Sequence, residues 1–160
     1  MDLQNLDYNS AEELMELIRQ INTKYYTRLT SNICFIEEYE DSIKFVYLVT
    51  LKDAYSHLVK VFDYDLSPKG KQNAKSHLFL YVDHLQEGLI DTLRRIVDLQ
   101  IKAIKNNIPS KDFNAIDVQI AQKVAELRVL DKITLDERIE GYQSLFDYLV
   151  EIRKKFYSQQ

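Results

Sequence analysis

Apolar residues recur at spacings of three and four along most of this chain, which is the pattern of amphipathic helices. Ser10 and Glu13 form the S-x-x-E pattern of a capping box, so a first helix is expected to begin at Ser10. A break is predicted at residues 40–42, where the sequence reads Glu-Asp-Ser. The buried stripe of this helix is expected to comprise Leu14, Ile18, Ile21, Tyr25, Leu29 and Ile36.

The segment from Ser42 to Phe62 admits two predictions. Residues 43–51 are rich in β-branched and aromatic side chains, as in a strand. A helical step nevertheless continues through the whole segment without a turn signal, which favours a helix capped by Ser42. Its inward positions would be Val46, Thr50, Ala54, Leu58 and Val61. The strand stays an alternative, and it would overturn a simple helical bundle.

Three further helices are expected downstream. Residues 63–71 are predicted to be a loop because they contain Pro68 and Gly70. A second cluster of helix breakers falls at residues 106–110, and a third, weaker one at residues 131–134. The third helix, over residues 72–105, has a regular inward face: Leu78, Val82, Leu85, Leu89, Leu93, Ile96 and Ala103. The fourth runs from Ser110 or Lys111 to Leu130, and the fifth begins at Thr134, which forms a second capping box with Glu137.

Composition supports the same fold class. The 160 residues include only three glycines and two prolines, whereas β and α/β domains need many tight turns built from such residues. We therefore predict an all-α protein with one domain over residues 1–160. Helices this long in so short a chain predict an elongated bundle of four to five antiparallel helices.

Several features predict a cytoplasmic protein without membrane association. The first residues lack the basic and apolar regions of a secretory signal. The longest apolar run, Phe45–Leu51, is much shorter than a membrane span and includes Thr50. Cys34 is the single cysteine, so an intramolecular disulfide is excluded.

The three histidines limit which catalytic or metal-binding sites the chain can form. His77 and His84 lie two turns apart on the third predicted helix, and Glu87 lies one turn beyond His84. Together with a residue from a facing helix, these three could hold a metal, as in helical di-iron proteins. However, no histidine has glutamate three residues before it, which is the spacing those proteins use. We predict no catalytic residue and no cofactor, and a metal-dependent helical enzyme stays a second alternative.

Charge is unevenly distributed along the chain. Residues 1–66 hold 6 basic and 12 acidic residues, whereas residues 67–111 hold 8 basic and 4 acidic residues. A basic helix start suits phosphate groups, so binding of nucleic acid or another anion is the first alternative function. Its candidate residues are Lys69, Lys71, Lys75, Arg94 and Arg95.

The features together favour a protein that acts by binding. Long helices offer extended surfaces, and the 11 tyrosines suit positions that are buried on association. The acidic first segment and the basic middle segment could also pair between subunits. We therefore predict a non-enzymatic interaction or oligomerisation subunit, an adaptor or scaffold component of a larger assembly. Its partner would be a second copy of the chain or a dedicated protein.

Overall fold

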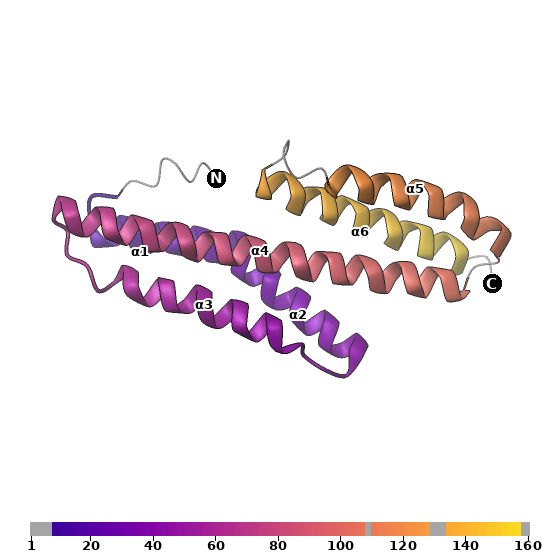
Figure 1. Cartoon of the computed structure of the whole chain (residues 1–160), viewed down its shortest axis with the longest axis horizontal. Coiled ribbons are helices and arrows are strands. Elements are labelled where there is room, and N and C mark those ends of the chain that lie inside the picture. Colours follow the sequence, from indigo (N-terminus) through magenta and orange to yellow (C-terminus); the bar gives the residue numbers. More distant parts are fainter. Residues whose placement is uncertain (1–7, 108–109, 129–133, 158–160) are drawn as a thin grey trace. The chain divides into compact units, whose positions relative to one another are not determined.

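The computed structural model describes residues 8–107, 110–128 and 134–157 (Figure 1). These residues form helices and contain no strand, which confirms the all-α prediction and makes the strand alternative for residues 43–51 wrong. The elements are α1 (Ala11–Ile21), the π-helical turn η2 (Asn22–Tyr26), α2 (Thr27–Glu40), α3 (Phe45–Val61), α4 (Pro68–Asn107), α5 (Ser110–Arg128) and α6 (Leu135–Tyr157).

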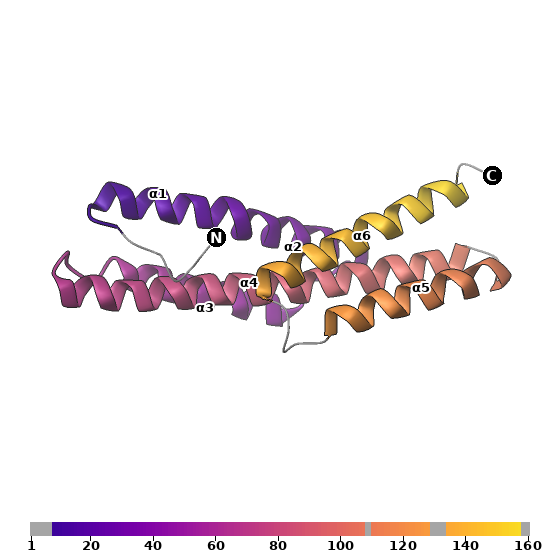
Figure 2. The same cartoon turned by 90° about the horizontal axis from the view of Figure 1, so that it is seen from above.

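The chain divides into two compact units, unit 1 (Met1–Leu89) and unit 2 (Ile90–Gln160). In unit 1, α1, η2 and α2 run in one direction, α3 returns, and the first part of α4 runs in the original direction (Figures 1 and 2). In unit 2, the rest of α4, α5 and α6 alternate in the same way. Each unit is thus built from antiparallel helices. Helix α4 continues from unit 1 into unit 2. The single domain over residues 1–160 stays a prediction.

The start of α1 confirms the first capping box. The Ser10 hydroxyl accepts a hydrogen bond from the Glu13 amide at 3.2 Å, and the Glu13 carboxylate accepts one from the Asn9 amide at 2.5 Å. All six predicted stripe residues are buried, together with Ile33. The turn η2 inserts one wider turn between α1 and α2, and the Thr27 hydroxyl donates to the Asn22 carbonyl there at 3.2 Å.

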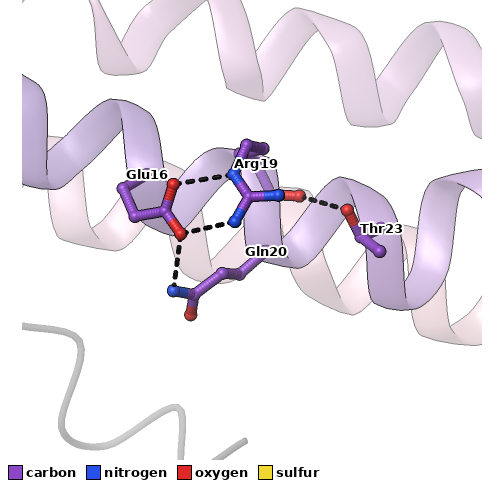
Figure 3. Close-up of polar contacts among 4 residues, drawn as sticks. All are labelled: Glu16, Arg19, Gln20 and Thr23. Atoms are coloured by element: carbon purple, nitrogen blue, oxygen red, sulfur yellow. Dashed lines mark hydrogen bonds and ion pairs between the residues drawn. The ribbon is translucent and has the colours of Figure 1, made fainter.

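The exposed face of α1 is ordered by short-range polar contacts (Figure 3). The Glu16 carboxylate accepts from Nε and Nη2 of Arg19, both at 2.7 Å, and from the amide of Gln20 at 3.0 Å. The hydrogen bonds from Arg19 and Gln20 lower the pKa of Glu16 to about 2. The Thr23 hydroxyl continues the network by donating to the Arg19 carbonyl at 2.9 Å. These contacts belong to the local stability of the helix rather than to a binding site.

The boundary between α2 and α3 lies where the break was predicted, but its details differ. Asp41 ends α2 in the left-handed conformation with φ 53°, which aspartate tolerates better than most residues. The prediction that Ser42 caps the next helix is wrong, because Lys44 is the residue before α3 and has an extended backbone. The predicted inward position of Val46 is also wrong. The residues buried on α3 are Tyr47, Ala54 and Val61, which are seven apart and lie on one line of the helix.

Helix α4 begins earlier than predicted, so residues 68–71 are helix and not loop. Pro68 occupies the first helical position, where its missing N–H costs nothing. Ser67 accepts from the Gly70 amide at 3.1 Å and donates to the Asp65 carboxylate at 2.5 Å. A Cβ at position 70 would lie 2.2 Å from that carboxylate, so only glycine allows the preceding loop to fold this closely over the helix start.

The remaining predictions for the second half of the chain are largely confirmed. The seven residues expected on the inward face of α4 are all buried. At the start of α6, the Glu137 carboxylate accepts from the Thr134 amide at 2.6 Å, and the Thr134 hydroxyl accepts from the Glu137 amide at 3.2 Å. Helix α5 begins at Ser110 as expected. Residues 108–109 and 129–133, which include parts of two predicted loops and Leu130, lie outside the described residues.

Candidate interaction surface

A stripe of apolar side chains runs along the solvent side of α3 and is the main candidate site. Its positions alternate in steps of three and four, which is the heptad spacing by which one helix packs against another. We call this set the α3 stripe. It consists of Phe45, Leu48, Lys52, Tyr55 and Val59 of α3 and of Phe62, which caps the end of the helix; all members except Lys52 are apolar.

The apolar members of the α3 stripe are strongly exposed. Their exposed fractions are 78% for Phe45, 47% for Leu48, 43% for Tyr55, 61% for Val59 and 54% for Phe62. Other large apolar side chains are exposed elsewhere in unit 1, but they do not form a comparable line on one helix; they are Met15, Tyr39, Ile43, Val46, Leu66, Phe79 and Leu80. Among the described residues of unit 2, Val118 is the single large apolar side chain exposed to this degree.

The middle of the α3 stripe is held in place by a tyrosine cluster. The ring of Tyr55 packs edge-on against Tyr26 of η2, with centroids 5.7 Å apart. The hydrogen bond with Tyr26 raises the pKa of Tyr55 to about 12, and burial raises the pKa of nearby Tyr81. The Tyr81 hydroxyl in turn donates to the side-chain carbonyl of Asn22. Because η2, α3 and α4 are tied together here, the stripe rests on a firm base within unit 1.

All three histidines of the chain meet between α3 and α4. Nδ1 of His57 lies 3.0 Å from Nδ1 of His77, and the ring of His57 stacks on those of His77 and His84 at 5.3 Å. The Tyr64 hydroxyl lies 3.4 Å from Nε2 of His77. Burial lowers the pKa of His57, and the electrostatic effects of His84, His77 and Lys60 lower it further. The cluster therefore favours neutral imidazole at His57.

The predicted metal residues are only partly brought together. His77 and His84 share the cluster with His57, which sequence reasoning did not include, whereas Glu87 is exposed on α4. Within the described ranges, no three histidine, cysteine or carboxylate side chains are arranged so that they could hold a metal ion. Nδ1 of His57 lies within hydrogen-bond distance of Nδ1 of His77 instead, at 3.0 Å.

The predicted anion-binding residues fall in both units. Lys69, Lys71 and Lys75 lie in the first two turns of α4 in unit 1. Arg94 belongs to unit 2, where its Nε donates to the Tyr142 hydroxyl at 3.0 Å and its Nη1 pairs with Asp91 at 3.3 Å. Arg95 is half-buried and also takes part in an interaction within the chain. The two arginines would have to exchange these contacts for a phosphate, so nucleic-acid binding stays a prediction.

Comparisons with known proteins do not add to this picture: no protein-family model, no curated protein and no solved structure matches the chain. Function therefore has to be argued from the residues and their geometry.

None of the helices in the described part of the chain combines the length and the apolar character required to cross a membrane.

Sequence reasoning missed the α3 stripe although its signal was present. The segment 45–62 carries apolar residues on more than one face, and only one face was assigned. A helix of this kind needs a partner on each apolar face, or it leaves one face exposed. The alternation of three and four from Phe45 to Phe62 would have identified the second face.

Proposed function

We propose that this chain is a non-enzymatic interaction subunit that assembles with another protein through the α3 stripe. The single observation that supports it is a line of five exposed apolar side chains at heptad spacing on one helix. The largest contiguous apolar patch of a soluble protein is often a functional surface, and a patch rimmed by polar residues is typical of protein-binding sites. The occupant that matches heptad spacing is another helix.

The composition of the α3 stripe also suits a binding site. Aromatic side chains supply much of the energy at protein interfaces because they bury a large area with few rotatable bonds. Phe45, Tyr55 and Phe62 are spread along the stripe and are separated by the smaller Leu48 and Val59. Large and small side chains in alternation can interlock with a partner helix. As part of the proposal we place the subunit in the cytoplasm, where the exposed thiol of Cys34 would remain reduced.

The test compares two substitutions of the same type on the same helix. Val59→Glu places a carboxylate in the α3 stripe, whereas Val46→Glu places one at an exposed position of α3 outside the stripe. Both positions are exposed, so we expect both variants to keep the helical circular dichroism spectrum of the wild type. The native mass of the assembly is then measured for each tagged chain expressed in its own host.

We expect the wild type and Val46→Glu to be recovered in an assembly heavier than the 18.9 kDa chain. Val59→Glu should be recovered as the free chain, because burying an unpaired carboxylate in an apolar interface costs several kcal/mol. If Val59→Glu remained in the same assembly as the wild type, the proposed use of the stripe would be wrong. An unassembled wild-type chain would also contradict it.

A further inference from the structure

The α3 stripe is self-complementary when two copies of it pack antiparallel. Its six positions form three pairs about a midpoint between Asp53 and Ala54: Phe45 with Phe62, Leu48 with Val59, and Lys52 with Tyr55. When two identical helices pack antiparallel about a two-fold axis, each residue lies opposite its counterpart on the other side of the midpoint. We propose, building on the proposed function, that the α3 stripe binds a second copy of this chain with the two α3 helices antiparallel.

The apolar pairs match in size in this register. Phe45 would pack on Phe62 of the second copy at both ends of the interface, and Leu48 on Val59 of the second copy nearer the axis. These contacts place the two phenylalanines together and the two branched aliphatic side chains together. Aromatic pairs at helix contacts are worth more than the area that they bury. The interface is self-complementary, as a two-fold interface must be.

Lys52 distinguishes the antiparallel from the parallel arrangement. In an antiparallel pair it lies beside Tyr55 of the second copy, whereas in a parallel pair in register it would face Lys52 of the second copy. Two like charges at an interface oppose association, while a lysine over a tyrosine ring is attracted to it. The chain already makes such contacts: the Lys24 ammonium lies 4.9 Å from the ring centre of Tyr25, and that of Lys123 lies 5.6 Å from that of Tyr148.

The area available is sufficient for a modest dimer. With about 150–250 Å² for a fully exposed large side chain, the exposed fractions put roughly 500–600 Å² of side-chain surface on each stripe. Two copies would then bury at most about 1,000–1,200 Å², which is the size of a weak interface.

The first test measures the mass of the purified full-length chain alone by sedimentation equilibrium across the micromolar range. We expect a reversible monomer–dimer equilibrium for the wild type and for Val46→Glu. For Val59→Glu we expect the dimer affinity to fall by at least about tenfold. A wild-type chain that stays monomeric, or that forms an odd-numbered oligomer, would overturn the inference. If that monomer still entered a heavier assembly in its host through Val59, the proposed function would stand and only the second copy would be wrong.

The second test determines the register by disulfide cross-linking in a Cys34→Ser background, because Cys34 is exposed and free. Leu48 and Val59 are about 16 Å apart along α3. In the antiparallel pair, a cysteine at position 48 meets one at position 59 of the second copy, but two cysteines at position 48 lie far beyond the roughly 7 Å limit for a disulfide. The double variant Leu48→Cys with Val59→Cys should cross-link, and neither single variant should. Cross-linking of Leu48→Cys alone, or no cross-linking of the double variant, would overturn the antiparallel register.

Discussion

Gly88 of α4 lies close to side chains of α2 and α3, and replacing it by alanine is a sharp test of that packing. A Cβ at this position would lie 2.8 Å from Cγ2 of Thr50 on α3 and 3.3 Å from Cδ2 of Leu29 on α2. The leucine end can rotate away, but the Thr50 methyl is attached at a β-branched carbon with few accessible rotamers. Gly88→Ala therefore pushes α4 away from α3.

The magnitude follows from two opposing effects. Alanine is about 1 kcal/mol better than glycine in a helix. Inserting a methyl group into a closely packed site costs about 1–3 kcal/mol. We therefore expect Gly88→Ala to lower the free energy of unfolding by about 0–2 kcal/mol instead of raising it. Thr50→Ser removes the methyl at fault and keeps the hydroxyl, which donates to the Val46 carbonyl at 3.1 Å. In that background Gly88→Ala should stabilise the protein by about 1 kcal/mol.

The assay is a double-mutant cycle of urea unfolding at one protein concentration, followed by circular dichroism. Hydrogen exchange of buried amides in α2 and α4 assigns the change to unit 1. The expected coupling between positions 50 and 88 is about 1–3 kcal/mol. If Gly88→Ala stabilised the wild-type chain by about 1 kcal/mol, or if the coupling were below about 0.5 kcal/mol, the close approach of α3 and α4 would be wrong.

Three further predictions concern titration and capping. Burial lowers the pKa of His57 below its ordinary 6.5, and the nearby charges of His84, His77 and Lys60 outweigh the opposing effect of Asp53. The stability that His57 contributes is therefore present above pH 6.5 and is lost as the pH falls through the lowered pKa. On acidification, the urea midpoint of unfolding should drop more in the wild type than in His57→Gln. Equal drops in the two proteins would refute this prediction. The hydrogen bond with Tyr26 raises the pKa of Tyr55 to about 12, so the stability that Tyr55 contributes is present below pH 10 and is lost as the pH rises through 12. In an NMR titration, Tyr26→Phe should bring the pKa of Tyr55 back towards 10. A wild-type Tyr55 that already titrates near 10 would contradict the contact. Ser10→Ala should lower the free energy of unfolding by about 1 kcal/mol, because it removes the cap of α1. The control Ser31→Ala, on the exposed side of α2, should leave the stability unchanged. Equal effects of the two substitutions would argue against the cap.

Local signals in the sequence were sufficient for much of the secondary structure. The capping boxes at Ser10 and Thr134 predicted two helix starts correctly, because a cap depends on residues only three positions apart. The inward face of α4 was predicted because apolar residues recur along it in steps of three and four. Signals that depend on surroundings were interpreted less well. Pro68 and Gly70 were interpreted as loop residues. In the structure Pro68 occupies the first position of α4, and the missing Cβ of Gly70 leaves room for Asp65.

The candidate site could be predicted only in part for the same reason. Sequence periodicity shows that α3 is apolar on two faces, but it does not show which face the rest of unit 1 covers. Tertiary packing buries Tyr47, Ala54 and Val61 and leaves the α3 stripe exposed. It likewise brings His57 onto His77 and His84, twenty or more residues away. The all-α fold class was therefore determined by the sequence alone, because helices form from contacts within a few residues. The interaction surface was decided by the tertiary structure, because exposure depends on which distant segment packs against each face.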